Sequence, residues 1–296
     1  MKWNKILSCF ATMSFVFVSL SARTQDLSDY KSWVEAWNKP VKAFRIISNI
    51  HYVGTNFLAC YLITTPAGHI LIDTGMQESG PLVRANIEAL GFKLSEIKII
   101  LSSHSHFDHV AGHADMKAAT GAQVYAIEAD AAILESGGAK SFNPGTPYKP
   151  VKVDKALKDG EVVRLGNAAL TAHLTPGHTE GNTTWTTTVE EGRKKYDVVF
   201  VGSMSINPGV LIVNNAKWPK IDEAYARSFQ VLKSLPCDVF LGPHGIFFDF
   251  EKKMRLMTNG AKSNPFIDPE GYRNYIASYK KSYRDEILRE ESGKGK

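Results

Sequence analysis

Short apolar runs separated by turn residues predict the first group of strands and helices. The runs FRII (44–47), ACYLITT (59–65) and HILIDTG (69–75) have the length and β-branched content of strands. The following segments continue the pattern: a helix at about 81–90, a buried strand IKIILSS (97–103), a helix at about 110–119, a strand QVYAI (123–127) and a helix at about 129–135.

A loop separates this group from a second one. Residues 137–150, GGAKSFNPGTPYKP, hold three Gly and three Pro, which favour turns over regular elements. Strands are then predicted for EVVRL (161–165), ALTAHLT (169–175), NTTWTTTV (182–189) and YDVVFVG (196–202). A helix near 222–235, the strand DVFLG (238–242) and polar helices complete the chain.

Two successive halves, each made of strands and then helices, predict an α/β fold. The arrangement that buries both sheets is a four-layer αβ/βα sandwich, in which two mixed sheets pack face to face and the helices lie outside. No repeat or low-complexity linker interrupts residues 40–290, so we expect one domain over residues 23–296.

The first 22 residues differ from the rest of the chain. Lys2 and Lys5 form a basic start, residues 6–20 are mostly apolar, and small residues surround Ser21. This order is typical of a cleaved secretory signal peptide, and a short membrane anchor is the alternative. We expect residues 1–22 to be removed, the mature chain to begin near Ala22 or Arg23, and the protein to be periplasmic.

Composition limits the partners that this chain can have. Of the 296 residues, 44% are hydrophobic and 22% charged, which is too apolar for a disordered chain. No apolar run reaches the roughly 20 residues of a membrane span, so we expect no stable membrane anchor. Without residues 1–22 the chain has 33 basic and 30 acidic side chains, a net charge too small to indicate a nucleic-acid partner.

Cys60 and Cys237 are the cysteines of the predicted mature chain. An oxidising compartment would permit one disulfide between them. Cys60 lies inside the apolar run FLACYLI, where a buried free thiol is the commoner outcome. Sequence leaves both possibilities open.

The segment HSHFDH (104–109) concentrates side chains that bind metals. It offers three imidazoles and one carboxylate within six residues, which is the donor chemistry that zinc prefers. One ion cannot easily use all four groups, so the segment can supply two adjacent ions. His178 in TPGHTEG and His244 in LGPHGIF each follow a predicted strand in a Gly/Pro turn and complete a set of six ligands.

The remaining histidines are interpreted as ordinary surface or core residues. His51, His69 and His173 lie within predicted strands, and His113 opens the helix after the cluster. Asp73, at the end of a strand next to Gly75, has two interpretations. It is either a turn residue or a carboxylate that holds a ligand histidine in the required tautomer.

The pattern H-x-H-x-D-H followed by two distant histidines resembles the metallo-β-lactamase superfamily. The resemblance covers about residues 40–260 and implies the fold described above, with two zinc ions per chain. It is strong for the fold and weak for the substrate, since glyoxalase II, lactonases, ribonucleases and β-lactamases share the signature.

One position discriminates between branches of the superfamily. Ser203, in VVFVGSMS, stands where hydrolases similar to glyoxalase II have a metal-bridging aspartate and where the first β-lactamase subclass has a cysteine. The chain therefore looks like the third subclass. That resemblance implies a first zinc site of His104, His106 and His178, and a second of Asp108, His109 and His244.

The resemblance also implies a reaction. Zinc lowers the pKa of water, so the attack on a β-lactam carbonyl needs no acylated serine. Asp108 and His178 are the residues expected to be catalytic, and Ser203 and Ser205 are expected to bind the substrate carboxylate from beside the second zinc. We expect a small-molecule β-lactam substrate, carbapenems included, and favour a monomer. The alternatives are a lactonase or thioesterase of the same fold and a non-catalytic zinc-binding protein.

Overall fold

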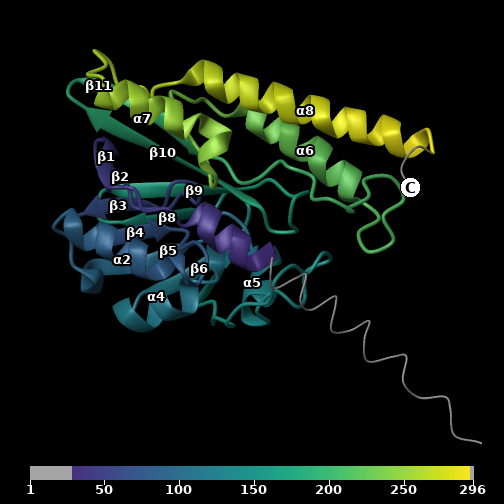
Figure 1. The fold of residues 1–296 in the computed structure, drawn as a ribbon, viewed down its shortest axis with the longest axis horizontal. Coiled ribbons are helices and arrows are strands. Elements are labelled where there is room, and N and C mark those ends of the chain that lie inside the picture. The colour runs from purple at the N-terminus through teal and green to yellow at the C-terminus, as the bar shows by residue number, and fades with distance from the viewer. Residues whose placement is uncertain (1–28, 294–296) are drawn as a thin grey trace, which may run out of the picture.

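The computed structural model describes residues 29–293, and its strands form two sheets that lie between two layers of helices (Figure 1). The first sheet has seven strands in chain order. They are β1 (Phe44–Ile47), β2 (Ile50–Tyr52), β3 (Tyr61–Thr65), β4 (Gly68–Ile72), β5 (Ile97–Leu101), β6 (Gln123–Ile127) and β7 (Lys155–Leu157). Strands β1 to β4 pair antiparallel and β4 to β7 pair parallel, so the sheet is mixed.

The second sheet has five strands in the order β12-β11-β10-β9-β8. These are β8 (Val162–Leu165), β9 (Ala168–Leu174), β10 (Thr183–Glu191), β11 (Lys194–Phe200) and β12 (Val239–Leu241). Only β11 and β12 pair parallel, because α6 connects them and returns the chain to the same edge.

Helices cover the outer face of each sheet. Helices α2 (Ser79–Ala89), α4 (His113–Thr120) and α5 (Glu128–Glu135) lie on one side, and α6 (Ile221–Ser234), α7 (Phe250–Thr258) and α8 (Pro269–Glu291) on the other (Figure 1). The predicted four-layer αβ/βα fold is therefore confirmed. The remaining helices are short: α3 (Phe107–Val110) and the 3-10 turns η1 (Leu94–Glu96) and η2 (Gly245–Phe248). A further helix spans residues 29–37.

Two hydrophobic clusters form the core of the described residues. One hydrophobic cluster lies between the sheets and beneath α6 and α8, and a second lies between the first sheet and its helices. Trp185 of β10 is fully buried, and its indole Nε1 donates to the carbonyl oxygen of Ser102, 3.0 Å away. This bond links the second sheet to the segment that follows β5, where the histidine cluster begins.

Several expectations differ from the structure in detail. Sequence analysis did not predict the short strands β2 and β7 or the helix of residues 29–37, because three-residue strands carry too little periodicity to recognise. The helix predicted at about 110–119 corresponds to α4, which begins three residues later, and residues 107–110 form the separate short helix α3. The predicted signal peptide lies outside the described residues.

The two cysteines of the described residues do not pair with each other. Cys60 and Cys237 are both free thiols, and Cys60 is buried as its apolar surroundings suggested. Burial also raises the pKa of the Cys60 thiol well above its ordinary value.

Within residues 29–293, no helix has both the length and the apolar composition that crossing a membrane requires.

Candidate metal centre

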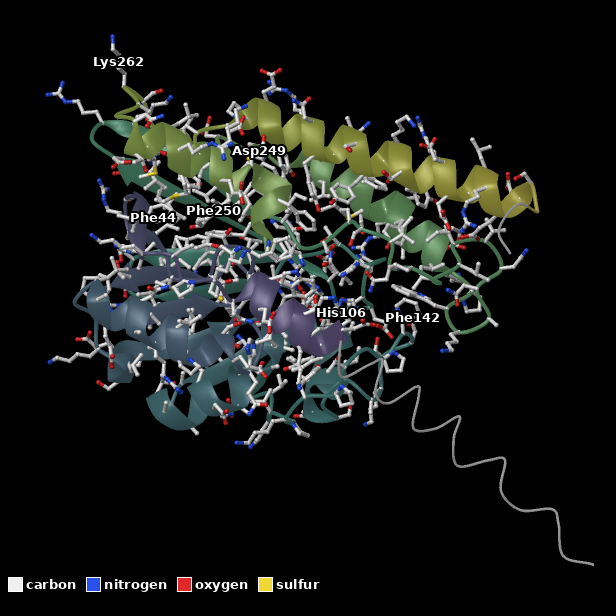
Figure 2. The ribbon with its side chains drawn as sticks, viewed as in Figure 1. Phe44, His106, Phe142, Asp249, Phe250 and Lys262 are labelled. Carbon is white, nitrogen blue, oxygen red and sulfur yellow. The ribbon has the colours of Figure 1, made fainter. Side chains whose placement is uncertain are left out.

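All six predicted metal ligands lie at the same edge of the two sheets. His104 and His106 follow β5, and Asp108 and His109 lie in the short helix α3. His178 occupies the connection between β9 and β10, and His244 follows β12. Figure 2 labels His106 between the two helical layers. The fold thus collects donors from three loops that are far apart in sequence.

The first triad consists of His104, His106 and His178. One ligand nitrogen from each ring lies within 4.8 Å of the others. The ring of His178 is 4.8 Å from that of His104 and 4.6 Å from that of His106, centroid to centroid, and both pairs are edge-on. Three imidazoles that meet at one point without stacking can share a metal ion.

The second triad consists of Asp108, His109 and His244, again with donor atoms within 4.8 Å of one another. Nε2 of His109 lies 3.1 Å from Oδ2 of Asp108 and 3.1 Å from Nε2 of His244. The two triads are neighbours, since the rings of His104 and His109 are 4.2 Å apart. The structure therefore groups the six residues as the resemblance implied.

Hydrogen bonds fix the orientation of the first triad. Nδ1 of His178 lies 2.8 Å from the carbonyl oxygen of Ser205, so Nδ1 carries the proton and donates it. Its Nε2 is then free to bind a metal. Nε2 of buried His104 has no hydrogen-bond partner among the described residues, and Nδ1 of the same ring contacts the Ser103 hydroxyl at 3.1 Å.

Asp73 supports the loop that carries the histidine cluster. Its carboxylate accepts hydrogen bonds from the backbone nitrogen and the hydroxyl of Ser103, at 2.7 and 2.6 Å. Oδ2 also lies 3.6 Å from Nδ1 of His109, an ion-pair distance. Asp73 adopts φ 60°, so it forms the turn after β4 as well. Both interpretations of this residue fit the structure.

Among the five histidines of the two triads, only His109 has a raised pKa. Burial lowers the pKa of His104 and His178 well below the ordinary value, and it lowers the pKa of His106 to about 4. These rings are therefore neutral ligands. Burial opposes charge on His109 as well, but the carboxylates of Asp108 and Asp73 outweigh it and raise its pKa to about 10. Burial lowers the pKa of His244, the other histidine of this triad, to about 3. The raised pKa in the second triad therefore belongs to His109, which has two carboxylates beside it.

Ser203 and Ser205 lie beside His178. Their hydroxyl oxygens are 2.9 Å apart, and the Ser205 hydroxyl is 3.2 Å from Nδ1 of His178. Ser205 thus contacts the first triad directly and the Ser203 hydroxyl contacts Ser205, whereas both serines were expected beside the second triad. Their role in substrate binding stays a prediction. Asp108 is the only carboxylate in the two donor groups found within residues 29–293.

Aromatic side chains border the second triad. Phe57 and Trp37 stack on each other with centroids 5.2 Å apart, and both contact the ring of His244. Trp33 stacks on Trp37 and reaches Phe107 of α3. Sequence analysis missed this group, although the four-residue spacing of Trp33 and Trp37 is a helical signal.

Among the described residues, neither triad includes His51, His69, His113 or His173. His113 is fully buried, and its two ring nitrogens contact Thr74 and Ser102 at 2.8 and 3.0 Å. It is the satisfied core residue that we expected. Sequence analysis also missed Asn182, whose side chain accepts from the backbone nitrogen of Ser203 at 2.7 Å.

The donor set fits zinc. Buried imidazole nitrogens without hydrogen-bond partners, together with one carboxylate oxygen, are what a tetrahedral zinc site uses, and three ligands per triad leave a position open. A purely structural site would fill that position. The geometry indicates a metal centre that is able to bind and activate a further molecule.

Comparisons with known proteins agree with this geometry. A sequence profile described as Metallo-beta-lactamase superfamily matches residues 53–244. The structure is similar to native FEZ-1 metallo-beta-lactamase from Legionella gormanii, with 44% identity and a TM-score of 0.84 over 86% of this chain and 98% of that one. It is also similar to BJP-1, a subclass B3 metallo-beta-lactamase of Bradyrhizobium japonicum, with 37% identity and a TM-score of 0.82 over 88% and 99% of the two chains.

Curated relatives carry a different name. Hydroxyacylglutathione hydrolase of Methylococcus capsulatus is 34% identical over 122 residues, which are 41% of this chain and 40% of that protein. The corresponding protein of Rhodospirillum rubrum is 29% identical over 136 residues, 46% of this chain and 44% of that protein. This chain therefore covers less than half the length of these relatives.

Proposed function

This chain belongs to the metallo-beta-lactamase superfamily and is a metal-binding hydrolase, and we propose that it hydrolyses the amide bond of β-lactam antibiotics with two zinc ions. Penicillins, cephalosporins and carbapenems are the proposed substrates. Similarity to subclass B3 enzymes over nearly the whole length of those enzymes supports this choice.

The observation that carries the proposal is the pair of adjacent triads with a single carboxylate. Two zinc ions bring four positive charges, and Asp108 is the one protein ligand that cancels any of them. The centre therefore keeps a net positive charge, which attracts an anionic substrate. A bicyclic β-lactam carries a carboxylate next to its scissile amide and so matches this field.

The chain's own residues then have distinct tasks. His104, His106 and His178 would hold one zinc ion, and Asp108, His109 and His244 the other. When bound, zinc supplies Lewis acidity and lowers the pKa of water so that it can attack a carbonyl at neutral pH. Ser203 and Ser205 are the residues whose hydroxyls we propose to hydrogen-bond a substrate carboxylate.

Thioester hydrolysis is the second candidate. The curated relatives are described as hydroxyacylglutathione hydrolases. Against this candidate, Ser203 occupies the position where the resemblance would require a bridging aspartate. The shorter shared length of these relatives also gives them less weight than the structural neighbours.

We further propose that the protein is exported to the periplasm as a monomer, where β-lactams arrive before they reach their cell-wall targets. In that location its activity would confer antibiotic resistance. The basic, apolar and small residues of positions 1–22 are the observation that supports export.

One assay separates the candidates. Purified protein with two equivalents of zinc is given a chromogenic cephalosporin, a carbapenem, a simple lactone and a glutathione thioester. The proposal expects turnover of both β-lactams at kcat/KM values far above those for the lactone and thioester. Turnover of the lactone or thioester alone would reject β-lactam hydrolysis, and a protein that binds zinc without turning over any substrate would support a non-catalytic role.

A further inference from the structure

A buried carboxylate lies where the apolar face of a helix is expected. In α5, Asp130, Ile133 and Leu134 are all buried, and their spacing places them on the same face. Asp130 is 1% exposed, whereas Ile133 and Leu134 pack as core residues do. A carboxyl group in such a position costs free energy unless hydrogen bonds compensate for its loss of water. Its partners therefore indicate what it does.

Both identified partners of Asp130 belong to loops that carry the first triad. Oδ1 accepts a hydrogen bond from the Ser105 hydroxyl at 3.1 Å and another from the backbone nitrogen of Gly181 at 2.9 Å. Ser105 stands between His104 and His106. Gly181 is three residues after His178. One oxygen atom thus joins two segments that are otherwise separate in sequence.

The contact with Gly181 is so close that it excludes a side chain there. A Cβ atom on Gly181 would lie 2.4 Å from Cγ and 2.5 Å from Oδ1 of Asp130. Real Cβ atoms do not approach other atoms to that distance, so glycine is what permits the hydrogen bond. The backbone and the carboxylate are therefore fitted to each other.

We infer that Asp130 is a positioning residue for the first triad. By holding the Ser105 and Gly181 segments at a fixed separation, its carboxyl group makes the rings of His104, His106 and His178 face a common point. The contact lies outside the ligand set itself, and partners of this kind commonly set metal affinity.

The surroundings of Asp130 suit a group that bonds through one oxygen. Burial raises the pKa of Asp130 to about 7, with Glu180 adding to the effect, while the bonds from Ser105 and Gly181 oppose it. Oδ2 has no hydrogen-bond partner among the described residues. An amide that keeps Oδ1 should therefore replace the carboxyl group better than an apolar side chain can.

The test measures zinc affinity at each triad separately, without substrate. Competition with a chromogenic chelator gives the zinc dissociation constant in two backgrounds, His244→Ala, which leaves the first triad, and His178→Ala, which leaves the second. Asp130→Leu keeps the number and branching of heavy atoms but removes both hydrogen bonds. We expect it to weaken zinc binding about 10–100-fold in the first background and to leave the second nearly unchanged.

Two further variants separate positioning from folding. Asp130→Asn keeps an acceptor at Oδ1 and should restore most of the zinc affinity. Asp154→Leu is the control for loss of a carboxylate elsewhere in the fold: Asp154 is more exposed than Asp130, accepts from the backbone nitrogen of Val124 at 2.8 Å and pairs with Lys117, and none of these partners belongs to a ligand loop. Cobalt-substituted protein provides a second measurement, in which the visible spectrum of Asp130→Leu should change and that of Asp154→Leu should not.

The inference is wrong if Asp130→Leu leaves the zinc affinity of the first triad unchanged. It is also wrong if Asp130→Leu weakens zinc binding equally in both backgrounds, or if Asp154→Leu weakens the first triad as much as Asp130→Leu does. If Asp130→Leu does not fold, Ser105→Ala and Gly181→Ala decide. The first removes the hydroxyl that donates to Asp130 and the second adds a Cβ that collides with it, so each should weaken the first triad alone. The inference rests on the metal-binding part of the proposed function and not on its substrate. Wild-type protein that fails to bind zinc would reject the proposed function, whereas unaltered variants of a zinc-binding protein reject only the role of Asp130.

Discussion

Nε2 of His109 lies 3.1 Å from Nε2 of His244, although 135 residues separate the two histidines in sequence. Two imidazole nitrogens at this distance can share either a proton or a metal ion, and Oδ2 of Asp108 faces the same region at 3.1 Å from His109 and 3.5 Å from His244. This relationship defines the second triad.

Asp108→Ala removes the only carboxylate of the second triad. We expect zinc affinity there to fall by at least about 100-fold, since even partners outside the ligand set commonly account for 10–100-fold. The first triad should retain its zinc. Metal analysis after dialysis against a weak chelator measures both. A variant that still holds two zinc ions as tightly as the wild type would refute the assignment of Asp108.

Asp73→Asn tests the support of His109. Asparagine tolerates the positive φ of 60° at this position, so the turn should persist while the negative charge near Nδ1 of His109 is lost. We expect a 10–100-fold weaker second site. Asp249→Asn is the matched control, because Asp249 also has positive φ, 54°, and lies at the start of α7 (Figure 2). Equal losses in the two variants would assign Asp73 to turn formation alone.

Metal removal and inhibitor class provide a third prediction. If water activated by zinc is the nucleophile, a strong chelator should abolish hydrolysis and added zinc should restore it. Inhibitors that acylate a serine nucleophile should have no effect. Monobactams, which lack the fused ring with its carboxylate, should be poor substrates. Inhibition by a serine-directed reagent, measured as loss of kcat/KM for a cephalosporin, would contradict the mechanism.

The stability of the metal-free protein should depend on the ionisation of Asp130. Its pKa in the folded state is raised to about 7, so between the ordinary value and pH 7 the folded state binds a proton that the unfolded state has released. The free energy of unfolding should therefore decrease as pH rises through this range, by up to about 1.4 kcal/mol per pH unit. Urea unfolding of wild type and Asp130→Asn at pH 5, 6 and 7 isolates this contribution. Parallel pH profiles for the two proteins would contradict it. Glu180 and Tyr148 are the ionisable neighbours that the comparison holds constant.

The amino-terminal segment leads to a prediction about processing. The basic, apolar and small residues of positions 1–22 predict cleavage near Ala22 or Arg23. Mass spectrometry of protein from the periplasm of an expressing bacterium should give a mature chain that begins there. Recovery of periplasmic protein that retains Met1 would exclude cleavage.

Sequence alone determined most of the elements and the local part of the metal centre. Strand β6 and helix α5 were predicted to within a residue because their periodicity is local, and the apolar runs of β5 and β12 reflect burial on both faces. The segment HSHFDH likewise shows its chemistry directly, since four donors within six residues rarely serve another purpose. The assignment of these donors to two triads came from family resemblance and was not derivable from spacing.

Only the tertiary structure decided which distant groups complete and support the site. His178 and His244 could be recognised as candidates, but the partners of each depend on how β9–β10 and β12 are placed against β5. Ser203 and Ser205 lie by His178 because β11 ends there, and no local pattern encodes that placement. Asp130 gave no signal in sequence because an acidic residue in the first turn of a helix is ordinary. Its function depends on hydrogen bonds across 25 and 51 residues, which exist only after both sheets have packed.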